Sequence, residues 1–170
     1  KAVMDWYTVY AKAIGVEAHE LVPSHWGLVQ CMAGIVGGML AGAISDRLFG
    51  SRRGPVAVLL YAVLLVGSVV IALTLGSPVV GWTASLMVVA FIGVHGMLSG
   101  TASMDFGGKA NAGLAVGLID GCVYLGIGLQ ALVLGHLLPD GDAGKLAAHW
   151  RAWPLVMIPV AALGLGLATR

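Results

Sequence analysis

The stretch that decides the fold runs from Gly54 to Met104 and reads GPVAVLLYAVLLVGSVVIALTLGSPVVGWTASLMVVAFIGVHGMLSGTASM. It contains no Asp, Glu, Lys or Arg, and it is far longer than the about 20 apolar residues that one membrane-spanning helix needs. The Gly76-Ser77-Pro78 triplet near its middle is a turn signal. The stretch therefore predicts two consecutive membrane-spanning helices, at about 55–75 and 80–100.

Three further apolar runs flank this stretch. They predict helices at about 26–44, 111–138 and 153–169. The segments are apolar on every side, which favours helices over the alternating strands of a membrane barrel. The residues before the first helix, 1–10, resemble the interfacial end of a preceding membrane helix because they carry aromatic side chains. We expect the chain to be a piece of a longer membrane protein.

The composition agrees with a membrane protein. Of the 170 residues, 59% are hydrophobic and only 10% are charged, whereas soluble domains carry about 25% charged residues. A net charge of +1 excludes the basic surface of a nucleic-acid binder. Enzyme motifs are absent from the sequence, and we predict neither a metal site nor a cofactor. The predicted fold is an all-α polytopic bundle of about five membrane-spanning helices.

Small residues recur at helical spacing. Glycines every four residues, at 34, 38 and 42 and again at 113, 117 and 121, form stripes that predict close helix packing or sliding faces. Cys31 and Cys122 lie in apolar runs, and we expect both to be thiols of the packed core.

Basic residues in the short loops predict the orientation in the membrane. Arg47, Arg52 and Arg53 crowd the loop at 45–54, and Lys109 follows in the loop at 101–110. By the positive-inside rule these two loops are cytoplasmic, and the loop at 139–152 lies outside.

The most specific motif spans Gly42 to Gly54 and reads GAISDRLFGSRRG. Asp46 and Arg47 fall at the end of one expected helix, and the arginine pair at 52 and 53 precedes the next. Opposite charges placed in this way can pair across helix ends and hold one side of a transporter shut. The alternative is a basic loop that only sets the topology.

This motif resembles the Gly-x-x-x-Asp-Arg/Lys…Arg-Arg loop of the major facilitator superfamily. The spacing before the arginine pair resembles the organophosphate:phosphate antiporter family, which includes glycerol-3-phosphate and hexose-phosphate transporters. Three other patches resemble the same family: Asp5-Trp6…Tyr10, Gly96–Gly113 and Gly117–Gly126.

The resemblance implies the C-terminal half of a twelve-helix carrier in the plasma membrane (the bacterial inner membrane), from the end of helix seven to helix twelve. Its partners would be the lipid bilayer and the missing N-terminal half. Its activity would be exchange of a phosphorylated organic anion for inorganic phosphate, by alternating access. The alternatives are another organic-anion or sugar symporter, or a membrane sensor of sugar phosphate. The family's phosphate-binding arginines lie on helices one and seven, outside this chain.

Asp120 is the one charge inside the span at 111–138. A carboxylate at that depth costs about 2.5–3.5 kcal/mol, so it faces either the substrate cavity or a basic partner on another helix. Tyr124 lies four residues on, and the resemblance places this tyrosine at the cavity. His95 either binds an anion or carries a proton there, or is a hydrogen-bonded packing residue. Gln130 either lines the same pathway or bonds a neighbouring helix.

Overall fold

The computed structural model describes the backbone of residues 1–170 and every side chain except those at positions 101, 102, 106, 107 and 109. The side chain of Lys109, one of the expected cytoplasmic charges, therefore lies outside the described residues. Within the described chain the structure consists of helices, without strands. In chain order these are α1 (Ala2–Ala13), α2 (Leu21–Ser24), α3 (Trp26–Leu48), α4 (Arg53–Thr74), α5 (Val79–Gly96), the π-helix η1 (Met97–Ala102), α6 (Ser103–Leu137), the 3-10 helices η2 (Gly141–Lys145) and η3 (Ala147–Arg151), and α7 (Ala152–Ala168).

Five helical segments are long and apolar enough to cross a membrane, which confirms the expected all-α polytopic fold. Their bounds are Trp26–Leu48, Arg53–Thr74, Val79–Asp105, Ala110–Leu137 and Ala147–Ala168. Helix α3 continues beyond the expected end at 44, because Asp46 and Arg47 form its polar last turn.

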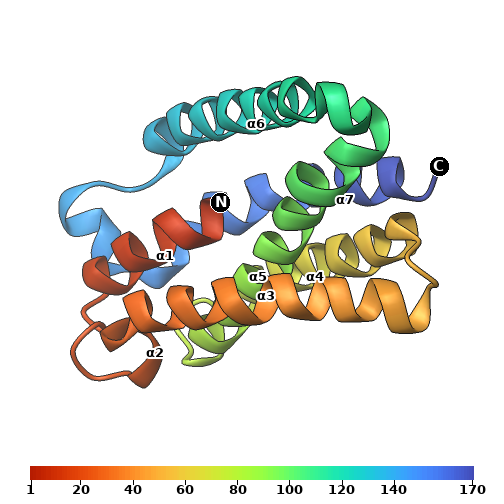
Figure 1. Cartoon of the computed structure of the whole chain (residues 1–170). Coiled ribbons are helices and arrows are strands. Elements are labelled where there is room, and N and C mark those ends of the chain that lie inside the picture. The colour runs from red at the N-terminus through yellow and green to blue at the C-terminus, as the bar shows by residue number, and fades with distance from the viewer.

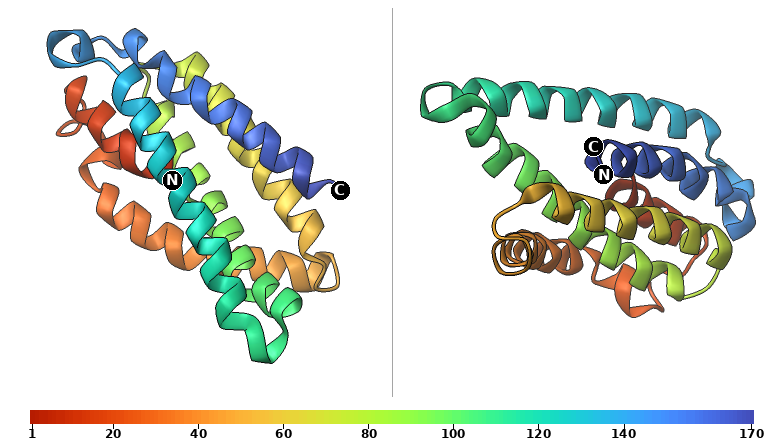
Figure 2. Two further views of the ribbon diagram at one scale, coloured as in Figure 1. Left: turned by 90° about the horizontal axis from the view of Figure 1, so that it is seen from above. Right: turned by 90° about the vertical axis from the view of Figure 1, so that its right-hand side faces the viewer.

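Helix α5 lies at the centre of the bundle. It packs against α3 on one side and α4 on the other, and α4 in turn packs against α7. Helix α6 arches over this group, as Figures 1 and 2 show. It contacts η1 at its start, and α1 and α7 further along. Most of its membrane span is not buried inside the chain, although Leu134 near its end is fully buried.

The close approach of α3 to α5 occurs at Gly37. A Cβ atom added there would lie 2.5 Å from the carbonyl oxygen of Val89 and 3.3 Å from the amide nitrogen of Gly93. The stripe at 34, 38 and 42 is not a close packing face within the described chain: a Cβ atom at Gly34 would only touch Ile92, and those at the other two positions would meet open space, as would those of the stripe at 113, 117 and 121. The alternative of sliding faces stays a prediction.

The core differs from expectation at the cysteines. Cys31 and Cys122 are both exposed on the surface of the described chain, so they are not core thiols. The core instead forms two clusters of apolar side chains. The larger one gathers the aromatic residues at one end of the bundle, and the smaller one joins α3, α4 and α5 at the other end.

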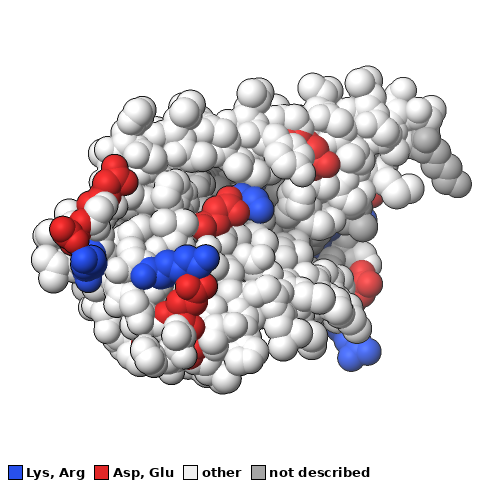
Figure 3. All heavy atoms as spheres, turned by 90° about the vertical axis from the view of Figure 1, so that its left-hand side faces the viewer, with Lys and Arg blue, Asp and Glu red and all other residues white. Residues whose placement is uncertain are grey.

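The aromatic end is tied together by side chains of α1 and of the loop before α7. The ring of Tyr10 lies 5.6 Å from that of Trp150, and the amide of Gly76 donates a hydrogen bond of 2.8 Å to the Tyr10 hydroxyl. The loops at 76–78 and 139–152 therefore lie at the same end. Figure 3, which views the molecule from the left-hand side of Figure 1, shows acidic and basic side chains scattered over an otherwise uncharged surface.

The other end holds the turn between α5 and α6. Helix α5 continues into the π-helix, where the Ser103 hydroxyl contacts the carbonyl oxygens of Ser99 at 2.6 Å and Gly100 at 2.7 Å. Gly108 then breaks the helix with φ 60° and ψ 179°, a conformation that is essentially restricted to glycine. This break allows α6 to turn back across the bundle.

Candidate functional site

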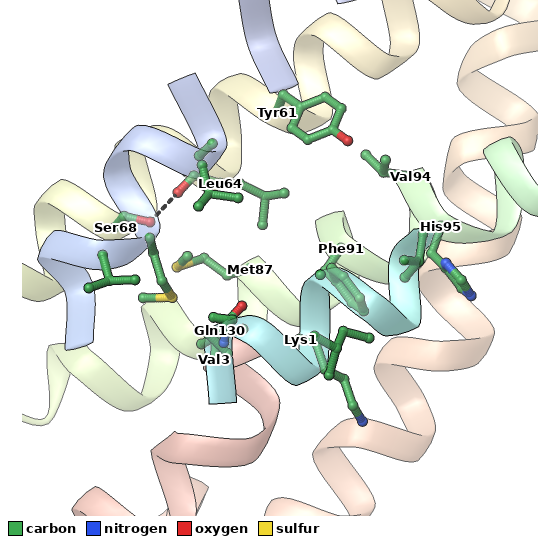
Figure 4. Close-up of a pocket in the computed structure, with 18 of the residues that line it drawn as sticks. Lys1, Val3, Tyr61, Leu64, Ser68, Met87, Phe91, Val94, His95 and Gln130 are labelled. Atoms are coloured by element: carbon green, nitrogen blue, oxygen red, sulfur yellow. Dashed lines mark hydrogen bonds between the residues drawn. The ribbon is translucent and has the colours of Figure 1, made fainter. Parts of the chain in front are cut away.

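A cavity of about 490 Å³ lies between α1, α4, α5, α6 and α7 (Figure 4). Its lining is mainly apolar, with a few polar side chains among aliphatic ones. An apolar lining that carries only a small number of polar groups is typical of small-molecule sites. The described polar or basic residues that line it are Lys1, Tyr61, Ser68, His95 and Gln130.

The structure places two of the four expected cavity residues in this lining. His95 comes from α5 and Gln130 from α6, and Figure 4 shows them apart from each other, with His95 at the edge of the drawn residues and Gln130 nearer their middle. The amide of Gln130 makes no hydrogen bond to any described part of the chain. The Ser68 hydroxyl is already engaged with the carbonyl of Leu64 at 2.8 Å. The free polar capacity of the cavity therefore rests on His95, Gln130 and Tyr61.

Asp120 and Tyr124 are not among the described residues that line this cavity. Tyr124 is 66% exposed, on the outer side of α6. Asp120 is half-buried and accepts a hydrogen bond of 2.6 Å from the hydroxyl of Ser99 in η1. Such a short distance is typical of a hydroxyl that donates to a carboxylate. Among the described side chains, no basic residue on another helix pairs with Asp120, so this alternative is not observed.

Ser99 links Asp120 to the cavity. Its hydroxyl also lies 3.5 Å from Nδ1 of His95, one helical turn earlier. The imidazole stacks on the ring of Phe91, with an interplanar angle of 4°. The sequence analysis missed Ser99, although a hydroxyl four residues after a histidine on a charge-free helix was a signal, because such residues share a face.

The charged loops form a second site at the opposite end from the aromatic cluster. Arg53 at the start of α4 pairs with Asp105 near the start of α6, with 3.1 Å between Nε and Oδ2. The segments 45–54 and 101–110 therefore meet at one end of the bundle. The second is not the loop expected from the sequence, because it is helical apart from the break at Gly108. The pair is partly exposed, with 28% of the Arg53 side chain and 58% of the Asp105 side chain accessible.

Asp46 does not pair with an arginine of its own loop among the described residues. It accepts a hydrogen bond of 2.9 Å from the hydroxyl of Ser51, which has the positive φ of 63°. Arg47 and Arg52 are exposed and form no ion pair with a described side chain, and Gly42 is exposed as well. Asp105 and Ser51 are thus the loop partners that the sequence analysis did not identify.

A second cavity, of about 540 Å³, lies beside the Arg53–Asp105 pair. Its lining includes Ser51, Arg53 and Asp105 from the loops and Tyr61 from α4. Because Tyr61 also lines the first cavity, its side chain lies between the two cavities. The Nη1 atom of Arg53 is buried there without a hydrogen-bond partner in the described chain.

Comparison with known proteins identifies relatives of this chain. It is 30% identical over 165 residues to the membrane sensor protein UhpC of Escherichia coli, a match that covers 95% of this chain and 35% of the relative. It is 36% identical over 129 residues to the glycerol-3-phosphate transporter of Bacillus subtilis, which covers 73% of this chain and 28% of the relative. The UhpC sensor of Salmonella typhimurium is 30% identical over 141 residues, covering 81% and 31%. No family profile and no solved structure matches the chain.

The five membrane-spanning helices and these relatives define the class, an integral membrane protein of the transporter and membrane-sensor type rather than an enzyme. More closely, the chain belongs to the organophosphate:phosphate antiporter-like proteins of the major facilitator superfamily and corresponds to a C-terminal fragment of such a protein. It spans about a third of the length of the relatives it matches.

Proposed function

We propose that the protein transports a phosphorylated small organic anion across a membrane in exchange for inorganic phosphate, by alternating access. The observation that carries the proposal is the similarity to a glycerol-3-phosphate transporter over 73% of the chain. The mainly apolar cavity with the imidazole of His95 and the amide of Gln130 supports it, because both groups can donate hydrogen bonds to an anion.

The site would be completed by the other half of the carrier. In this superfamily, substrate binds near the midplane between the two halves. Tyr124 and the exposed faces of α3 and α6 are available for that contact, and Asp120 would act at the edge of the substrate path. The remaining apolar surface would face lipid, in the bacterial inner membrane.

The charged loops would act as a gate. The Arg53–Asp105 pair joins the turn between α3 and α4 to the turn between α5 and α6, so the pair has to break if the two hairpins separate at this end. Gly42, Asp46, Arg47 and Arg52 would complete the gating loop. We assign this end to the cytoplasm, because three arginines crowd the loop at 45–54.

A second candidate is a membrane sensor that binds the anion without moving it. Two of the relatives are membrane sensor proteins, and the match to one covers 95% of the chain. The same cavity would then bind a ligand whose occupancy is passed to a partner protein.

Counterflow in proteoliposomes tests the proposal and separates the two candidates. The full-length protein would be reconstituted with internal phosphate, and uptake of labelled glycerol-3-phosphate and glucose-6-phosphate would be measured. A carrier exchanges at least one of them for phosphate, and loses the exchange when internal phosphate is omitted. Saturable binding of either ester with no flux would establish the sensor instead, and the absence of both would contradict the proposal.

A further inference from the structure

We propose that His95, Ser99 and Asp120 form a proton-binding site in the membrane, which binds one exchangeable proton as an anion enters the cavity. The inference rests on the proposed function for its role in transport, but the site itself is defined by its own geometry. It joins the π-helix at the end of α5 to the middle of α6.

The three groups form a continuous hydrogen-bond chain. The distances are 3.5 Å from His95 Nδ1 to Ser99 Oγ and 2.6 Å from Ser99 Oγ to Asp120 Oδ1. A hydroxyl both donates and accepts, and an imidazole nitrogen does either, depending on its proton. The chain therefore has an ionisable group at each end and a proton-conducting group between them.

Two proton arrangements fit the same heavy-atom positions. In one, the imidazolium Nδ1–H donates to Ser99, and Ser99 donates to the Asp120 carboxylate. In the other, protonated Asp120 donates to Ser99, and Ser99 donates to a bare Nδ1. One arrangement becomes the other when the Nδ1–H bond breaks, the Ser99 oxygen takes that proton, and the original Ser99 proton passes to Asp120, so charge and atoms balance.

The hydrogen-bond chain of His95, Ser99 and Asp120 is the local means of neutralising the Asp120 carboxylate. Of the described basic side chains, none lies within ion-pair distance of its carboxylate. The groups facing the cavity from other elements are the neutral phenol of Tyr61 on α4 and Lys1, whose ammonium lies 3.3 Å from Asp5. The α7 lining is apolar, the Asp46 and Arg47 side chains are at the far end of α3, and Asp105 is paired with Arg53. Tyr124 and Cys122 on α6 are exposed.

The chemistry couples this proton to an anionic substrate. An unpaired carboxylate at membrane depth is costly, and beside a poorly solvated cavity it repels a phosphate ester that enters the cavity. Binding one proton removes that repulsion and leaves the imidazole able to donate to the anion. We therefore expect substrate binding to be accompanied by the uptake of one proton.

The first test needs no substrate. Infrared difference spectra of the purified full-length protein, recorded across a pH titration, should show a carboxylic-acid C=O band that disappears in Asp120→Asn. Ser99→Ala should shift the midpoint of this band. The matched control is Ser85→Ala, which removes a hydroxyl that bonds the Gly81 carbonyl within the same helix and should leave the midpoint unchanged. A spectrum that is the same in wild type and Asp120→Asn would overturn the proton site.

The second test measures coupling in proteoliposomes with glycerol-3-phosphate. An inward proton gradient should drive uptake in wild type, and Asp120→Asn should lose that component while it still exchanges internal for external substrate. Exchange with no response to the gradient in wild type would refute coupling. If no exchange occurs at all, the proposed transport function fails, and the infrared experiment alone decides whether the proton site exists.

Discussion

At the scale of single residues, the loop after α3 depends on one strained backbone position. Ser51 has a φ of 63°, a left-handed conformation that costs a non-glycine residue roughly 1–2 kcal/mol. Its amide donates to the Ser45 carbonyl at 2.9 Å, and its hydroxyl donates to Asp46 at 2.9 Å. These two bonds offset the strain and set the direction in which the chain enters α4.

We predict that Asp46→Asn lowers the transport rate more than the substrate affinity. Asparagine keeps the acceptor for Ser51 and removes the charge, so only the electrostatic contribution to the gate is lost. Because an exposed charge interaction is worth up to about 1 kcal/mol, the rate should fall by up to about fivefold. Initial rates and binding of the same substrate would be compared, with Ser51→Ala as the variant that keeps the charge. An unchanged rate would leave the loop a purely topological role.

At the scale of elements, the α3–α5 contact predicts which glycine cannot be replaced. Gly37→Ala should lower the free energy of unfolding by roughly 1–3 kcal/mol, because the new methyl group meets the backbone of α5 at Val89. Gly38→Ala faces open space and should be neutral or slightly stabilising. Thermal unfolding of both variants in detergent would check this, and equal losses in the two variants would contradict the assigned helix contact.

The Arg53–Asp105 pair predicts coupling between two hairpins. Arg53→Gln and Asp105→Asn should each change the transport rate, while stability changes by less than about 1 kcal/mol, because the pair is partly exposed. If the two side chains act through each other, the double variant should resemble either single variant. A double-mutant cycle of transport rates measures this, and strictly additive effects would show that the ion pair has no role in gating.

The helices themselves were predictable because hydropathy and helix length report directly on crossing a membrane. The partners of individual residues were not. Which glycine of α3 meets α5 depends on the rotation of that helix, and the sequence offers Gly34, Gly37 and Gly38 without a way to choose. The contact between Ser99 and Asp120 depends on the π-helix and on the break at Gly108, neither of which has a periodic signature. The exposed cysteines show the same limit, since membrane helices are apolar on both their packed and their lipid-facing sides.

At the scale of the whole molecule, the loops lie at two opposite ends of the bundle. This arrangement predicts which side of the membrane each loop faces. Cysteines placed at Ser51 and at Asp142 should react with an impermeant reagent from opposite faces of the membrane. Cys31 and Cys122 are exposed on the described surface and would first be replaced by alanine, so that each signal comes from the introduced thiol. Labelling of both positions in intact cells would overturn the assignment of ends.

The contact between α4 and α7 has a consequence for how the protein is made. Helix α4 ends at Thr74 and α7 begins at Ala152. The ribosome therefore synthesises α5 and the whole of α6 before α7, the partner of α4, leaves the ribosomal exit tunnel. Until then, one side of α4 has only lipid, or the insertion machinery, to cover it. The early part of the bundle, α3 and α4 on either side of α5, can assemble while the α7-facing side of α4 is still uncovered. A chain stalled before α7 would therefore present α4 to the membrane quality-control proteases.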